Sequence, residues 1–288
     1  MNTIYTDYKY CREIIKRHSK SFYYAFKQLP EDDANAVYAI YTFCRMADDI
    51  VDQTASVDYR KAVLDTFNSK LLQFEEGILI DEPMWRALKD VHQRYPLDLT
   101  AFKMQITGQQ MDLMYTQPET IKDIERYSLY VAGSVGRMLL PILSTNVTLE
   151  MKENAEKLGI AMQITNILRD IGEDFKRYQR VYIPKQIMNK FNYTIQQLAS
   201  FEINSDFINM WEYLAEYAET LYDEFLHYIN QYHIHARLPL LLSMLVYKEI
   251  LNEVRRNNYD CLTKRNHVST LDKYRIHQEA IVYLKGEE

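Results

Sequence analysis

Glycine and proline are scarce in this chain, with 7 of each among its 288 residues. β-Sandwiches, barrels and dinucleotide-binding folds usually need more of both, because these two residues supply most tight turns. Apolar residues three and four positions apart, the pattern of an amphipathic helix, instead recur in nearly every segment. The chain is therefore expected to be all-α.

The helical segments follow one another with short breaks. The longer ones are expected at about 7–18, 31–52, 97–115, 121–140, 149–176, 206–232, 236–257 and 271–284. No internal repeat and no low-complexity linker divides them. We predict a single all-α domain over residues 1–288, built as a bundle of roughly ten helices.

Composition excludes several classes of protein. The net charge of −6 argues against nucleic-acid binding, which requires a basic surface. The cysteines Cys11, Cys44 and Cys261 are too scattered for a zinc site or a disulfide framework, which suits a reducing cytoplasm. The first 15 residues show no signal peptide, and the longest apolar run, Leu238 to Tyr247, is about half of a bilayer span. We expect a cytoplasmic protein without a nucleic-acid partner.

A first acidic stripe lies near the end of the helix expected at 31–52. Asp48 and Asp52 are four residues apart and share a face, with Asp49 beside them and Arg45 one turn earlier. Like charges at this spacing, at the negative end of the helix dipole, destabilise a helix. A divalent cation held by carboxylate oxygens would compensate, and Mg²⁺ usually binds together with substrate phosphates.

A second polar stripe lies on the helix expected at 149–176. Gln163, Asn166, Asp170 and Asp174 follow a 3-4-4 spacing, whereas the opposite face is apolar. Such a stripe often faces water. Amides and carboxylates without a lysine make a poor solvated face, however, and they suit oxygen ligation of Mg²⁺.

The two stripes resemble the aspartate-rich motifs of the squalene/phytoene synthase family. The resemblance rests on DDIVD at 48–52 and NILRDIGED at 166–174, and it extends to HSKSF at 18–22, YAIYTFCR at 38–45, YVAGSVG at 130–136 and RVYIP at 180–184. It is strongest to the bacterial branch that makes C30 products. These motifs together are specific to the family, which a lone DDxxD would not be.

The resemblance implies an isoprenoid synthase-type helical bundle in which both motifs face a central cavity. It implies the head-to-head condensation of two farnesyl diphosphates, through presqualene diphosphate, to dehydrosqualene (4,4′-diapophytoene) in carotenoid biosynthesis. Three Mg²⁺ ions would neutralise the departing diphosphate. The reaction would not require NADPH. The carbocation left behind requires an apolar, dry cavity. The implied partners are prenyl diphosphates and, for product release, a peripheral contact with the membrane.

The resemblance also assigns roles to individual residues. The implied metal ligands are Asp48, Asp49, Asp52, Asn166, Asp170 and Asp174. The implied catalytic residues are Asp48, Asp52, Asp170, Asp174, Tyr127 and Tyr247. The implied substrate-binding residues are Ser19, Ser21, Phe22, Phe26, Tyr38, Tyr41, Arg45, Gln163, Asn166, Arg169 and Arg265. Phe26 and Tyr38 are expected to close the cavity floor and so to favour C15 over C20 chains.

Several alternatives stay open at this stage. Arg45 and Arg169 either bind diphosphate or pair with neighbouring acids, and the tyrosines either line the cavity or pack in the core. Gly133 and Gly136, which cost a helix about 1 kcal/mol each relative to alanine, fit a close substrate, a kink or tight helix packing. The alternative functions are a phytoene synthase that joins two geranylgeranyl diphosphates, an NADPH-dependent squalene synthase and a catalytically dead assembly protein.

Overall fold

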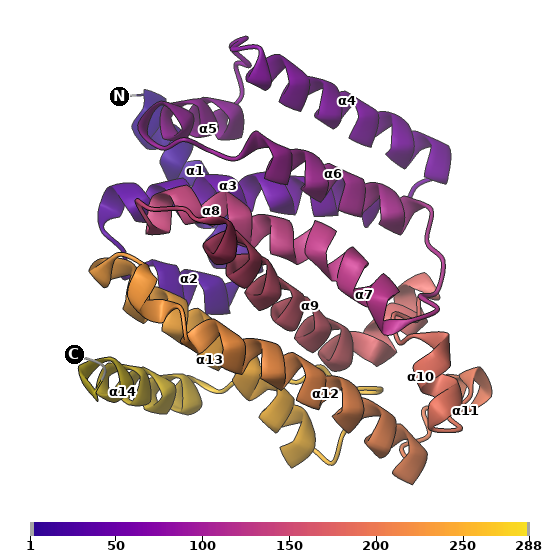
Figure 1. Ribbon diagram of the computed structural model, residues 1–288. Coiled ribbons are helices and arrows are strands. Elements are labelled where there is room, and N and C mark those ends of the chain that lie inside the picture. The colour runs from indigo at the N-terminus through magenta and orange to yellow at the C-terminus, as the bar shows by residue number, and fades with distance from the viewer. Residues whose placement is uncertain (1–2, 287–288) are drawn as a thin grey trace.

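The computed structural model describes residues 3–286, which contain helices and no strand (Figure 1). The all-α expectation is confirmed. The helices are α1 (Thr3–His18), α2 (Lys20–Phe26), α3 (Glu31–Val51), α4 (Val57–Glu75), α5 (Pro83–Arg94), α6 (Leu99–Leu113), α7 (Ile121–Ser128), α8 (Ser134–Leu143), α9 (Leu149–Tyr178), α10 (Lys185–Lys190), α11 (Ile195–Ala199), α12 (Ser205–Leu226), α13 (Ile234–Arg256) and α14 (Thr270–Gly286). No helix within 3–286 is both long and apolar enough to cross a bilayer.

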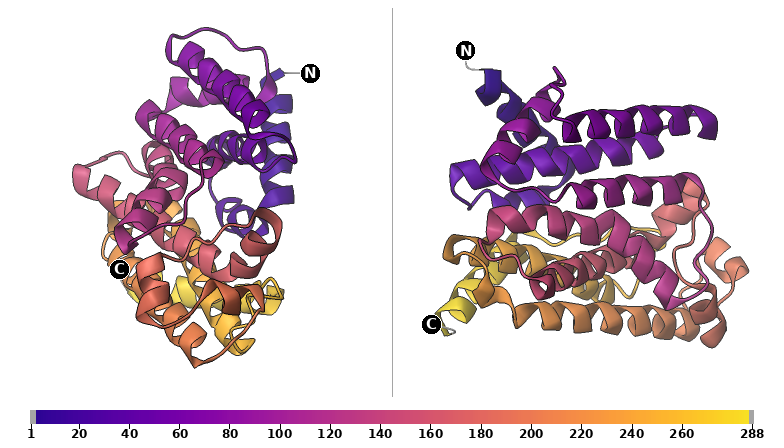
Figure 2. Two further views of the ribbon diagram at one scale, coloured as in Figure 1. Left: turned by 90° about the vertical axis from the view of Figure 1, so that its right-hand side faces the viewer. Right: turned by 45° about the horizontal axis from the view of Figure 1, so that its top comes forward.

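Two helices organise the bundle. In the N-terminal half, α3 packs against α1, α4, α5 and α6, and in the C-terminal half α9 packs against α12 and α13. Helix α8 contacts both α3 and α9 and so joins the halves. Both views of Figure 2 show the N-terminal helices above and the orange and yellow C-terminal helices below. The two acidic stripes therefore belong to the central helix of each half.

Side-chain caps fix where key helices begin. The Ser19 hydroxyl accepts the N–H of Phe22 and starts α2 as a helix separate from α1. Thr148 caps α9 in the same way through the N–H of Met151. At the other end of α9, Gln179 adopts a left-handed conformation (φ 53°) that turns the chain away.

The segment expected as one helix over 121–140 is instead broken by a π-helical turn, η1 (Leu129–Gly133), between α7 and α8. Glycine explains how closely this segment packs on α9. A Cβ added to Gly136 would lie 2.3 Å from the carbonyl oxygen of Ala155, and one added to Gly159 would lie 2.4 Å from that of Ala132. Gly136 and Gly159 thus allow the helices to pack closely. The π-helical turn is an irregularity that regular helical periodicity in the sequence does not predict.

Candidate active site

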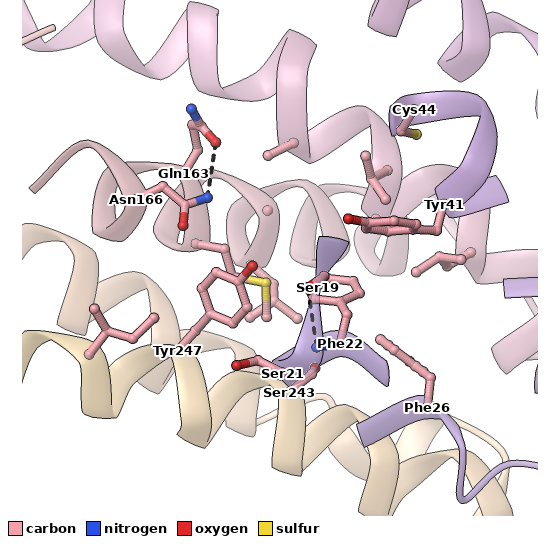
Figure 3. A pocket seen from close by; sticks show the side chains of 18 of the residues that line it. Ser19, Ser21, Phe22, Phe26, Tyr41, Cys44, Gln163, Asn166, Ser243 and Tyr247 are labelled. Carbon is pink, nitrogen blue, oxygen red and sulfur yellow. Dashed lines mark hydrogen bonds between the residues drawn. The ribbon is translucent and has the colours of Figure 1, made fainter. Parts of the chain in front are cut away.

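A cavity of about 710 Å³ opens between α2, α3, α8, α9 and α13 (Figure 3). Polar side chains of α3 and α9 lie at one end, and mostly leucine, valine and aromatic side chains line the remainder. The wall includes most of the predicted substrate-binding residues: Ser19, Ser21, Phe22, Phe26, Tyr41, Arg45, Gln163, Asn166, Arg169 and Arg265, together with Asp48 and Tyr247. The structure thus brings together residues more than 200 positions apart in the sequence.

On α3, Asp48 is the acid that lies on the cavity wall. Its Oδ1 accepts a hydrogen bond of 2.6 Å from Gln109 Nε2. Burial raises the pKa of Asp48 to about 7, an effect that Arg45 opposes and the nearby charges of Asp52 and Asp112 reinforce. Asp49 forms an ion pair with Arg45.

On α9, two arginines hold Asp170. Arg169 Nε donates to its Oδ1 at 2.8 Å, and Arg265 Nε lies 3.4 Å from the same oxygen. Burial raises the pKa of Asp174 to about 8, reinforced by the charges of Asp170 and Glu173. The α9 stripe therefore carries crowded carboxylates that the nearby arginines only partly neutralise.

The donor set fits divalent cations that bind together with a diphosphate. Burial above all, and then neighbouring carboxylates, raise the pKa values of Asp48 and Asp174, so a cation bound beside them would favour their charged forms. The buried Nε of Arg45 has no hydrogen-bond partner, so a donor is free for an anion. Among residues 3–286, no three His, Cys, Asp or Glu side chains are already grouped as a metal site. Mg²⁺ commonly takes one or two carboxylates and completes its shell with substrate phosphates, which matches this arrangement.

An aromatic group lines the cavity beyond the polar end. The ring of Phe22 lies 5.3 Å from that of Phe26, 5.7 Å from Tyr247 and 6.4 Å from Tyr41, measured between centroids. Figure 3 shows these four side chains around one space. Aromatic ring faces attract positive charge, so this wall suits a cationic intermediate as well as an apolar chain.

Tyr38 does not line the cavity, and its expected place at the cavity floor is corrected. Its buried ring packs on Tyr23, with centroids 5.9 Å apart. Ten residues separate it from Asp48, which turns it about 80° around α3, whereas Tyr41 lies within about 20° of Asp48.

Tyr127 lies behind the acidic end rather than on the cavity wall. It stacks on Tyr182, with centroids 5.0 Å apart, and its hydroxyl donates to Asp112 at 3.0 Å. Tyr182 donates to the other carboxylate oxygen at 2.7 Å, and Arg180 donates to the Asp112 carbonyl at 2.9 Å. Tyr127 therefore contacts the site only through this buried network.

Sequence reasoning missed the polar face of α6. Gln105, Gln109 and Asp112 follow a 4-3 spacing on this helix. Gln109 donates to Asp48, and Gln105 lies beside Gln109. The charge of Asp112 raises the pKa of both Asp48 and Asp174. This spacing was visible in the sequence as a third polar stripe, weaker than the others because it holds only one acid.

Comparisons with known proteins show which family this chain belongs to. The family model for squalene/phytoene synthases matches residues 15–272. The chain belongs to the squalene/phytoene synthase family. It is similar to a 4,4′-diapophytoene synthase of Staphylococcus haemolyticus, with 34% identity over 96% of this chain and 97% of that one. It is also similar to a 15-cis-phytoene synthase of Synechococcus elongatus, with 35% identity over 92% of this chain and 89% of that one.

Among solved structures, a dehydrosqualene synthase with a bound ligand superposes with a TM-score of 0.93 and 41% identity, covering 98% of each chain. This squalene/phytoene synthase is therefore a prenyltransferase with the same fold. The relative named for diapophytoene and the relative named for phytoene match at nearly the same identity, so overall similarity does not distinguish between these two products.

Proposed function

We propose that this prenyltransferase joins two farnesyl diphosphates head to head, through presqualene diphosphate, to form dehydrosqualene (4,4′-diapophytoene). The observation that carries the proposal is one cavity whose wall holds Asp48, Asn166 and three arginines together with aromatic and apolar side chains. The other acids of the two stripes do not line the cavity but lie beside it, as Asp170 does in contact with the wall residues Arg169 and Arg265. Its volume of about 710 Å³ lies within the range of about 300–1,000 Å³ typical of pockets for small molecules in general.

The polar end would bind and release the diphosphates. Mg²⁺ held by Asp48, Asp49, Asp52, Asn166, Asp170 and Asp174 would act as a Lewis acid that neutralises the leaving diphosphate. The free Nε of Arg45 and the hydroxyls of Ser19 and Ser21 are donors on the wall at this end. Arg169 and Arg265, now paired with Asp170, would exchange part of that contact for phosphate oxygens.

The apolar end would hold the chains and protect the cation. Ionisation leaves an allylic cation, to which the double bond of the second chain donates its electron pair to form the new carbon–carbon bond. Loss of a proton then closes the cyclopropane of presqualene diphosphate. Phe22, Tyr41 and Tyr247 present rings near that region and exclude water. A second ionisation drives rearrangement, and proton loss then gives dehydrosqualene without a hydride donor.

Tyr127 would act indirectly. Its hydroxyl fixes Asp112, whose charge reaches Asp48 and Asp174. We propose that Tyr127 holds the Asp112 carboxylate in place and in its charged form, whereas Tyr247 contacts the reacting chain.

The test is a product assay. Purified protein with Mg²⁺ and farnesyl diphosphate should give dehydrosqualene, in equal amount with and without NADPH, and less product from geranylgeranyl diphosphate. Squalene formed only with NADPH, or C40 phytoene as the main product, would establish one of the alternatives instead.

Two variants test the acids. Asp48→Asn and Asp170→Asn should remove turnover while the protein stays folded. Asp223→Asn, which alters an exposed acid paired with Lys248, is the control and should retain activity. Near-normal turnover in either site variant would refute the ligand assignment, and no turnover in the folded wild type would favour a non-catalytic role.

A further inference from the structure

The outward side of α14 is unusual for a solvated helix surface. Leu271, Tyr274 and Val282 are 78%, 62% and 69% exposed, respectively. Together with Arg275, Gln278 and Lys285, these residues form one face of the helix: each lies within about 60° of the mean direction of the six around the helix axis. We call these six residues the α14 outer face. It holds three large apolar side chains, two cations and an amide, and no acid.

The other side of α14 already accounts for its packing. Ile276 and Ala280 are buried in the core, and α14 packs on α13. The ring of Tyr24 on α2 packs on the His277 imidazole, with centroids 6.3 Å apart. Just after α2, Gln28 Oε1 lies 3.2 Å from His277 Nε2. The exposed leucine, tyrosine and valine are therefore not required to hold α14 on the bundle.

Lysines without an acidic partner lie on and beside the α14 outer face. Lys285 has no ion-pair partner among the described residues, whereas Arg275 is paired with three acids, Glu249, Asp272 and Glu279. Neighbouring α2 contains no acid, and Lys20 and Lys27 are exposed at its two ends. In a chain with a net charge of −6, such a region is a local exception that complements an anionic surface.

The α14 outer face is also continuous with the cavity opening. Lys273 in the first turn of α14 and Val268 just before it line the cavity, opposite Lys20 of α2. Burial and the charge of Lys20 lower the pKa of Lys273, which reflects how closely the two cations approach at this rim. A molecule leaving the cavity between α2 and α14 would emerge beside Leu271 and Tyr274.

We propose that the α14 outer face lies on the surface of an anionic phospholipid bilayer. Apolar side chains interspersed with lysine and arginine, without acids, are the pattern of a helix at a membrane interface. The reason for such contact rests on the proposed function, because a C30 hydrocarbon is insoluble in water and must pass from the cavity into an apolar phase. The bilayer takes up the product where the cavity opens.

The experiment measures binding of the whole protein to vesicles without any substrate, so its outcome is independent of the proposed function. Wild-type protein should float with vesicles that contain phosphatidylglycerol, bind phosphatidylcholine vesicles less, and dissociate as salt is raised. The triple variant Leu271→Ser, Tyr274→Ser, Val282→Ser should lose binding about tenfold or more. Lys285→Glu should weaken binding only to the anionic vesicles.

A matched control replaces the same residue types on other surfaces. Leu149, Tyr59 and Val57 are 73%, 57% and 49% exposed, and their triple replacement by serine should leave vesicle binding unchanged. Thermal melts and product formation in detergent should be alike in all variants, because none of the replaced residues lines the cavity.

Three results would overturn the proposal. These are no binding by the wild type, equal losses in the two triple variants, and a wild-type dimer that becomes monomeric in the α14 variant without vesicle binding. The last would identify a second copy of the chain as the occupant of the α14 outer face.

Discussion

Gly159→Ala is expected to separate the two helical segments that form one wall of the cavity. A Cβ at this position would lie 2.4 Å from the carbonyl oxygen of Ala132 and 2.6 Å from Gly133 Cα. Ordinary contact begins at 3.4 Å, so α9 and η1 must move apart by about 1 Å. The obstacle is backbone, which cannot rotate away as a side chain does.

The stability cost follows from two opposing effects. Overpacking costs about 1–3 kcal/mol, and a clash with backbone belongs at the upper end of that range. Alanine recovers about 1 kcal/mol of helix propensity relative to glycine. The free energy of unfolding should therefore fall by about 2 kcal/mol, measured as a lower urea midpoint at constant slope.

We expect Gly159→Ala to affect catalysis more strongly than stability. Gln163 and Asn166 lie one to two turns beyond Gly159 on the same helix. Because a displacement of about 1 Å in a catalytic group can cost about 100-fold, kcat/KM with farnesyl diphosphate should fall by that order. The product should remain the same.

Gly286→Ala is the control, because a Cβ there meets nothing within 4 Å. It should unfold at the wild-type urea concentration or slightly above it, with full activity. If Gly159→Ala stays within about 0.5 kcal/mol of the wild type, the range of ordinary surface changes, and retains activity, the close approach of α9 and η1 does not shape the site.

Three further predictions concern the cavity and its acids. Phe26→Ala should raise the ratio of kcat/KM for geranylgeranyl over farnesyl diphosphate by about 5- to 150-fold, the equivalent of about 1–3 kcal/mol of relieved overpacking. Tyr38→Ala, which removes a ring packed on Tyr23 behind the wall, should change the ratio less; equal ratios in Phe26→Ala and the wild type would place size selection elsewhere. Folded Asp48 keeps its proton up to about pH 7, against 3.8 for an ordinary aspartate, so burial of this carboxyl costs increasing stability as pH rises from about 4 to 8. Without metal, Asp48→Asn should therefore gain thermal stability over the wild type as pH rises, and a constant difference across a pH series would contradict this cause. Inorganic diphosphate should raise the melting temperature only with Mg²⁺ present, because the two bind as one unit; a shift of equal size without Mg²⁺ would refute the bridged site.

The placement of Tyr38 shows why spacing alone predicts a site incompletely. Periodicity put Asp48 and Tyr41 on one face of α3, and both lie on the cavity wall. Tyr38 continues the three- and four-residue spacing of this stripe, but ten residues from Asp48 the helix has rotated it off that face. A small angular error accumulates along a helix, so remote members of a stripe depend on the partner helix.

The helical class, the two acidic stripes and the family could all be predicted from the amino-acid sequence, because each depends on residue types at short spacing along one chain. Three features became visible only in the folded chain: which of those residues share a cavity, the hydrogen bond from Tyr127 to Asp112, and the third polar face that α6 contributes. The same holds for the glycines: Gly136 allows close backbone contact between α8 and α9, and Gly159 allows it between η1 and α9. These features depend on where helices far apart in the sequence meet, and spacing within one helix carries no information about the face its neighbour presents.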